Sequence, residues 1–243
     1  SEIRNKMDLN LAFLRGNWRG LTGRIQQVLS TGGCSPDNWL PNMAGVFGFA
    51  EKHHEYMLGI IACDPLRSLS WFDASRTAFW MGDTDKALRL AREGLDVAPG
   101  SWLNMQLVTL LIASGSYEEA NREIESRFQT AGIALAMRAM LAARQGDRAL
   151  VEQLAEQHDE AVGQNIYSVS LRAWGGDREG ANRLAAEMDR HEFGANGMVS
   201  AAFWCACGSP WDLEATPNFA AKLKEGNLPW PPKSPISFPL KDW

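Results

Sequence analysis

The sequence predicts an all-α fold in which about seven helix-turn-helix units stack side by side and end in an extended, Pro-rich segment. Glycines recur at intervals of 30 to 34 residues, and apolar residues at helical spacing flank most of them. A period of about 34 residues is typical of stacked helix-turn-helix units, which form binding scaffolds more often than enzymes. The periodic glycines are Gly16, Gly48, Gly82, Gly115, Gly146, Gly176 and Gly208.

The first two units follow this period weakly. Residues 3–14 have a helical pattern, and Gly16 and Asn17 mark the turn after it. The second unit ends at Asp64 and Pro65, where the proline stops a helix. Because the chain starts with Ser and reaches a helix almost at once, we expect a processed chain or a fragment of a longer protein.

The third unit, residues 68–99, has the clearest pattern. Its first helix carries Trp71 and other apolar residues at helical spacing, and Gly82 can supply the left-handed conformation that ends it. Asp83 can then accept hydrogen bonds from the free amides of the second helix. Pro99 stops that second helix.

This unit resembles a tetratricopeptide repeat (TPR). The residues at matching positions are Trp71, Gly82, Asp83, Ala87 and Pro99. Ala74, Ser75 and Ala78 stand where the family has Leu, Gly and Tyr, so small-residue packing is kept while the large tyrosine is lost. The resemblance implies a right-handed α-α superhelical solenoid whose first helices line the concave surface.

The next three units repeat the pattern. Their turn signals are Gly115 followed by residues 117–120, Gly146 with Asp147, and Gly176 with Asp177. Residues 68–190 are therefore the strongest match, within a TPR-like domain that we expect to cover residues 1–226.

The seventh unit departs from the pattern. We expect a helix over residues 198–207, a stop at Gly208-Ser209-Pro210, and a short helix over 217–225. Residues 227–243 cannot form a helix because of their prolines, and they should run extended. Their large apolar side chains favour packing on the array as a cap, with a peptide ligand for another protein or disorder as alternatives.

First-helix positions that face away from the second helix should line a concave groove. These positions are Phe72, Arg76, Trp80, Trp102, Met105, Gln106, Arg144, Tyr167 and Trp174. The set is rich in aromatic residues and Met, which suits a partner peptide or an amphipathic helix. The alternative is that these residues pack the superhelix. TPR proteins that grip a C-terminal carboxylate use Lys and Asn residues there, and this chain lacks that set.

No motif indicates catalysis, a cofactor or a metal site. His53 and His54 are adjacent in a predicted helix, so their side chains point about 100° apart and are poorly placed to share a metal. The net charge of −5 argues against nucleic-acid binding, and no apolar run could cross a bilayer. We therefore expect a non-enzymatic protein with a protein or peptide partner, without nucleic acid or membrane insertion.

The four cysteines, Cys34, Cys63, Cys205 and Cys207, do not have the spacing of a zinc site. Cys63 and Cys205 lie among apolar residues, so we expect buried, reduced thiols and a cytoplasmic protein.

The C-terminal residues 212–241 resemble the ending of helical-repeat halves of bacterial regulators, in which a winged-helix or cyclase-type output domain lies N-terminal. Two other functions stay open. One is a homodimerisation module of such a regulator. The other is a small-molecule sensor with an aromatic pocket around Trp80, Trp102, Tyr167 and Trp174.

Overall fold

The computed structural model describes residues 8, 10–31, 34 and 43–241, so most of the helix expected over residues 3–14 lies outside it, and residues 10–14 are helical. The helices are α2 (Leu21–Thr31), α4 (Ala50–Cys63), α5 (Ser68–Trp80), α6 (Thr84–Val97), α7 (Ser101–Ala113), α8 (Tyr117–Arg127), α9 (Ala131–Gln145), α10 (Arg148–Val162), α11 (Ile166–Gly175), α12 (Arg178–Met188), α13 (Gly194–Ala202) and α14 (Pro217–Gly226), with a 3₁₀ turn, η1 (Leu213–Ala215).

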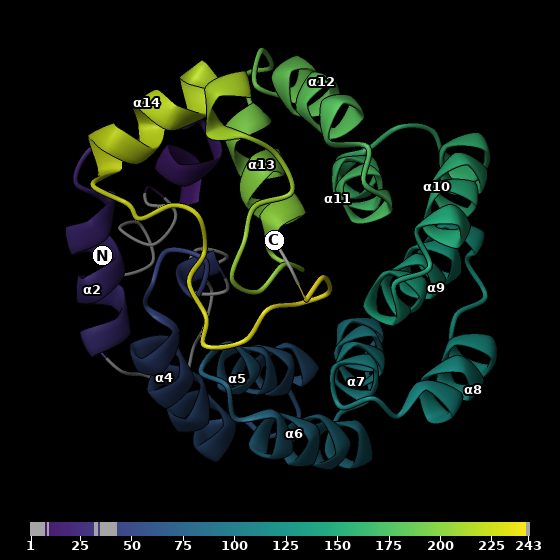
Figure 1. The fold of residues 1–243 in the computed structure, drawn as a ribbon. Helices are drawn as coiled ribbons and strands as arrows, with labels where there is room; N and C mark the ends of the chain where they lie inside the picture. Colours follow the sequence, from purple (N-terminus) through teal and green to yellow (C-terminus); the bar gives the residue numbers. More distant parts are fainter. Residues whose placement is uncertain (1–7, 9, 32–33, 35–42, 242–243) are drawn as a thin grey trace.

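Successive helices from α4 to α12 pack against each other and curve into a ring (Figure 1). Helices α5, α7, α9, α11 and α13 form the inner layer, and α6, α8, α10, α12 and α14 lie outside them (Figure 1). We call the side of the inner helices that points to the centre of the ring the inner face. The prediction of an all-α fold is confirmed for the described residues.

The turn predicted within the third unit is confirmed. Gly82 has the left-handed conformation, with φ of 90°. The Asp83 carboxylate accepts a hydrogen bond of 3.0 Å from the backbone N–H three residues later, in the first turn of α6. Asp147 and Asp177 cap α10 and α12 in the same way, at 3.1 and 2.7 Å. These side chains satisfy amides that a helix start leaves without a partner.

The first and last parts of the chain meet and close the ring, at a place we call the seam. Trp18 packs edge-on against Phe219 of α14, with 5.7 Å between the ring centroids. The Lys222 ammonium donates a 3.0 Å hydrogen bond to the Gly16 carbonyl, and the Thr22 hydroxyl donates one of 2.7 Å to the carbonyl at the end of α14. Figure 1 shows α14 beside the N-terminal helices.

The bounds predicted for the helix over residues 198–207 are wrong, because α13 begins earlier, at Gly194, and ends earlier, at Ala202. Beyond it, backbone groups take partners from across the ring. The Phe203 carbonyl accepts a hydrogen bond from Arg76, and Ala206 exchanges two backbone hydrogen bonds, of 2.9 and 3.0 Å, with Phe238. The short helix predicted next is confirmed as α14, which is capped at its C-terminus by Asn227 in the left-handed conformation.

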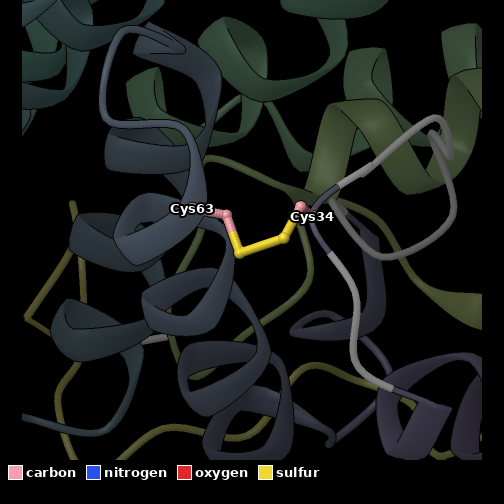
Figure 2. The surroundings of a disulfide bond; sticks show 2 residues. All are labelled: Cys34 and Cys63. Carbon is pink, nitrogen blue, oxygen red and sulfur yellow. A yellow bond between two sulfur atoms is a disulfide. The ribbon is translucent and has the colours of Figure 1, made fainter.

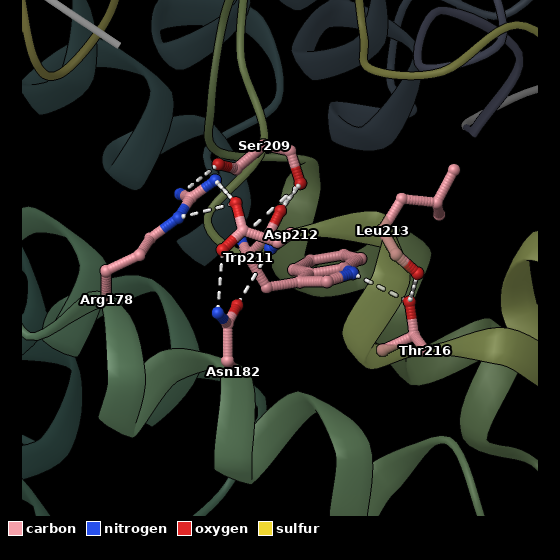
Figure 3. A network of polar contacts seen from close by, with 7 residues as sticks. All are labelled: Arg178, Asn182, Ser209, Trp211, Asp212, Leu213 and Thr216. Carbon is pink, nitrogen blue, oxygen red and sulfur yellow. Dashed lines mark hydrogen bonds and ion pairs between the residues drawn. The ribbon is translucent and has the colours of Figure 1, made fainter.

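A polar network fastens the chain between α13 and α14 to the outer layer (Figure 3). The Arg178 guanidinium on α12 donates to Asp212 at 2.7 and 3.1 Å and to the Ser209 carbonyl at 2.8 Å. Asn182, one turn later on the same helix, donates to the second Asp212 oxygen and accepts from the Asp212 backbone N–H. The hydrogen bonds from Arg178 and Asn182 lower the pKa of the Asp212 carboxyl.

The start of α14 is capped by a residue distant in sequence. The Asp189 carboxylate, at the end of α12, accepts hydrogen bonds of 2.9 and 2.7 Å from the backbone N–H groups of Asn218 and Phe219. An anion is favourable at a helix N-terminus, so this contact orients α14 against the outer layer.

The expectation of a buried, reduced Cys63 is wrong. Cys63 ends α4 and forms a disulfide with Cys34, with 5.4 Å between the Cα atoms (Figure 2). Both residues are exposed, since the end of α4 faces solvent rather than the core. Cys205, in contrast, is fully buried as expected. Within the described ranges, we find no helix of the length and apolarity that a bilayer crossing requires.

Candidate functional site

The structure brings the predicted groove residues to the inner layer, but most of them are covered. Six of the nine are exposed by 3% or less: Phe72, Arg76, Trp80, Met105, Gln106 and Trp174. Arg144 and Tyr167 are partly buried, and Trp102 is 40% exposed. The cover comes from residues 203–206 and from residues 228–241, which we call the C-terminal segment and which cross the ring (Figure 1).

Arg76, on α5, is the centre of the buried part of the site. Its guanidinium lies 4.8 Å from the ring centroid of Phe203, 4.9 Å from Trp204 and 5.6 Å from Trp80. It donates to the Phe203 carbonyl and, at 3.4 Å, to the side-chain oxygen of Gln106 on α7. Aromatic faces and carbonyl oxygens both stabilise a cation, so these groups replace part of the water that burial removes.

Burial disfavours the charged form of Arg76, but not enough to deprotonate it. Burial lowers the pKa of Arg76 to about 9, while the neighbouring Cys205 and Asp73 act in the opposite direction. Arg76 is therefore still cationic at neutral pH. Burial also raises the pKa of the Cys205 thiol to about 12, which leaves that thiol protonated and unreactive.

Two further titratable groups lie beside Arg76. His53 on α4 and Asp73 on α5 are each 1% exposed, and they line one narrow internal space with Arg76, Thr77 and Trp80. Neither ring nitrogen of His53 and neither carboxylate oxygen of Asp73 has a hydrogen-bond partner among the described residues. Burial, and then the charge of His54, lower the pKa of His53 to about 3, whereas burial raises the pKa of Asp73 well above its usual value.

The neighbouring His54 has a structural role. Its Nδ1 lies 2.9 Å from the Ala74 carbonyl oxygen and 3.1 Å from the Thr77 hydroxyl, so it joins α4 to α5. The sequence predicts no role for His53 or Asp73. The available signal was a charged residue, Asp73, inside a helix that is otherwise rich in apolar and small residues.

An aromatic cluster surrounds the exposed Trp102. We call this cluster the aromatic mouth, and it consists of Phe72, Trp102, Tyr167 and Trp204. Trp102, in the first turn of α7, stacks on Trp204 with 6.2 Å between ring centroids and 7° between ring planes. Phe72 packs against both rings, at 5.8 and 6.3 Å. Burial raises the pKa of the Tyr167 phenol, and the neighbouring Trp204 acts in the opposite direction. Trp102 is thus exposed to solvent yet held on buried rings.

Elsewhere on the inner face, Arg144 and Phe79 hold an extended stretch of the chain's own C-terminal segment. The Arg144 guanidinium on α9 donates to the carbonyls of Ser237, at 3.0 Å, and Pro239, at 3.5 Å. Between these residues, Phe238 packs edge-on against Phe79 at 5.4 Å and pairs its backbone with Ala206. The inner face therefore binds an extended chain through its main chain and one aromatic anchor.

The sequence matches no protein-family model and no curated protein. The TPR resemblance therefore stays a prediction from the residues quoted above. Within the described part of the chain, no group of three or more His, Cys, Asp or Glu side chains is placed to hold a metal ion.

Proposed function

We propose that the chain is a non-enzymatic protein-interaction module, built from TPR-like units of a superhelical solenoid, that binds a partner polypeptide at the aromatic mouth of its inner face. The observation that carries this proposal is the state of Trp102, which is 40% exposed while it stacks on Trp204 and Phe72.

An exposed tryptophan with this support suits protein binding. A large aromatic ring held in one orientation loses little conformational freedom on binding and offers much apolar area. Residues that dominate interface energies are rich in Trp, Tyr and Arg, and the mouth offers Trp102 with the half-buried Tyr167 beside it. The surrounding rings are buried, so a partner would meet a rigid surface.

Site-specific crosslinking tests this proposal. The photoreactive residue p-benzoylphenylalanine would replace Trp102 in one variant and Leu150 in a control, because Leu150 is 39% exposed on the outer helix α10. On irradiation in the native cell, we expect an adduct with a partner polypeptide from position 102 and little from position 150. An adduct of twice the chain's mass would instead indicate homodimerisation. Equal crosslinking from both positions would contradict the proposal.

We also propose that this module works in an oxidising compartment rather than in the cytoplasm. The exposed Cys34–Cys63 disulfide supports this, because reducing compartments keep exposed cysteines as thiols. Denaturing the protein from its native source and labelling it with a maleimide-polyethylene glycol should modify only Cys205 and Cys207. Labelling of all four cysteines would support the cytoplasm instead.

The resemblance of residues 212–241 to the ending of bacterial regulators supports a wider role. In this proposal the module is the interaction part of a larger bacterial regulator, and partner binding at the mouth is the signal that it receives.

A further inference from the structure

We propose that the C-terminal segment is an internal ligand of the inner face, and that the partner polypeptide carries an extended, Pro-flanked aromatic stretch that binds by replacing it. The part of this inference that concerns the partner rests on the proposed function. The internal occupancy itself is independent of it.

The two halves of the C-terminal segment are held differently. The first half belongs to the core beside the seam, where Trp230 packs against Trp211 at 5.2 Å and against Phe219 at 4.9 Å. The second half, residues 234–239, lies on the inner face instead. There the Ser234 hydroxyl donates a 2.9 Å hydrogen bond to the Trp80 carbonyl, at the end of α5. The second half can therefore leave without removing the first.

The second half binds as a peptide ligand binds. Its hydrogen bonds to Arg144 and Ala206 are made by the backbone of residues 237–239. Backbone hydrogen bonds do not depend on the side chains, so peptides of many sequences can form them. Its one fully buried large side chain is Phe238, which is 1% exposed against Phe79. A main-chain grip gives affinity and a single aromatic pocket gives specificity. Another chain with an aromatic residue next to proline has the same features.

The contacts of Arg144 at this site are made to an extended, apolar stretch of chain. Arg144 meets carbonyl oxygens rather than a carboxylate, and its guanidinium lies 5.9 Å from the ring centroid of Phe238. Ile236 and Phe238 are the large apolar side chains between the prolines at 235 and 239. The partner stretch should therefore be apolar and proline-containing in the part that replaces residues 235–239.

Tethering sets the strength of the competition. A segment attached by a short linker has an effective concentration in the millimolar range, so it masks a site from weaker ligands in solution. A variant that weakens only the internal segment should therefore expose the site to a free peptide. Phe238→Ala is such a variant, because it removes the anchor and leaves the wall residues intact.

The experiment uses a fluorescently labelled peptide of residues 232–241, PKSPISFPLK, and measures its anisotropy with the full-length chain. We expect weak binding to the wild type and binding at least about tenfold tighter to Phe238→Ala. Adding Arg144→Ala to Phe238→Ala should reverse most of that gain. A control peptide with Ala at the position of Phe238 should not bind.

Equal, weak binding to the wild type and to a folded Phe238→Ala would overturn the inference. If circular dichroism shows that Phe238→Ala does not fold, Ile236→Ala, which removes a half-buried side chain of the same half, makes the same test. The outcomes separate the two proposals. Peptide exchange without crosslinking at Trp102 would contradict the proposed function alone, and crosslinking without peptide exchange would contradict this inference alone.

Discussion

The repeats over residues 68–188 and the C-terminal part of the chain, residues 203–241, both cover apolar surface. Their contacts differ in how far apart in the sequence the partners lie. In the α5–α6 unit, the Ser75 hydroxyl donates to the carbonyl of Ala87, 12 residues away. In the C-terminal part, the Phe203 carbonyl accepts from Arg76 across 127 residues, and Ser234 reaches the Trp80 carbonyl across 154.

This difference has a consequence for stability. Stacked repeats are stabilised mainly by each unit and its neighbours, so local damage should stay local. The seam and the C-terminal segment instead join parts of the chain that are far apart in sequence, such as Lys222 and Gly16. Damage there should loosen the ring as a whole.

The largest expected effect is at the seam. Phe219 is fully buried and packs against Trp18, Trp211 and Trp230. Phe219→Ala should lower the free energy of unfolding by about 3–5 kcal/mol, because it leaves a cavity among three aromatic rings. Urea denaturation measures this loss. The control is Phe193→Ala, which removes a ring that is 55% exposed and should change stability by less than about 0.5 kcal/mol. Equal losses would mean that the seam does not close the ring.

The disulfide gives the next largest effect. It closes a loop with a sequence separation of 29 residues between Cys34 and Cys63, so its reduction should lower the free energy of unfolding by about 3–4 kcal/mol through the unfolded chain's entropy. Urea denaturation with and without dithiothreitol measures the difference. Cys63→Ser should abolish the response, whereas Cys205→Ala should keep it. If dithiothreitol destabilises Cys63→Ser as much as the wild type, the loss of stability does not come from the Cys34–Cys63 disulfide.

The sequence predicts the repeats because their signals are local. Gly82, Asp83 and Pro99 act within a few residues, and the structure places the helix ends where they indicate. The helical pattern also places Arg76 and Gln106 on the groove side of successive inner helices, and their side chains do meet.

The remaining features depend on distant contacts. After α13, the backbone of Phe203 and Ala206 is paired with the Arg76 guanidinium and the Phe238 backbone, and no local pattern contains these distant partners. Residues 70–80 of α5 are all buried, so no polar face identified Asp73 as part of a site. The exposure of Cys63 likewise depends on how α4 lies in the ring, which its apolar neighbours in the sequence did not show.

Two buried titratable groups, His53 and Asp73, lie beside Phe203 of the C-terminal part. They predict opposite dependences of stability on pH. His53 has a folded-state pKa of about 3, below its value of 6.5 in the unfolded chain, so its contribution to stability is lost as pH falls from 6.5. Asp73 has a raised folded-state pKa, so its contribution is lost as pH rises above 3.8. Between pH 4 and 6.5 the two effects oppose each other.

Single variants separate these effects. Asp73→Asn should lose stability more steeply than the wild type on acidification from pH 6 to 4, because the His53 effect is then unopposed. His53→Gln should change in the opposite sense relative to the wild type. Urea denaturation at several pH values measures both slopes. His54 remains in both variants, so its own lowered pKa shifts both slopes alike. If the wild type and both variants have the same dependence of unfolding free energy on pH, His53 and Asp73 do not have the shifted pKa values that their burial implies.

The smallest expected effects are at the helix caps of the repeats, where the change should stay local. Asp83→Ala should cost about 1 kcal/mol, because it removes the hydrogen bond to the α6 backbone. Ser116 holds the same position before α8, with φ of −80° and ψ of 57°, but its side chain makes no cap hydrogen bond. Ser116→Ala should therefore change stability by less than about 0.5 kcal/mol.

Ser116→Asp completes this comparison. The backbone at Asp83, with φ of −91° and ψ of 75°, is close to that at Ser116, so an aspartate there can form the missing cap. We expect a gain of about 0.5 kcal/mol, near the lower end for a cap, because Glu118 and Glu119 already carry negative charge in the first turn of α8. Thermal denaturation of all three variants at one pH gives the ranking. A loss in Ser116→Asp as large as that in Asp83→Ala would show that the caps are not interchangeable and that the repeats are less alike than their turns indicate.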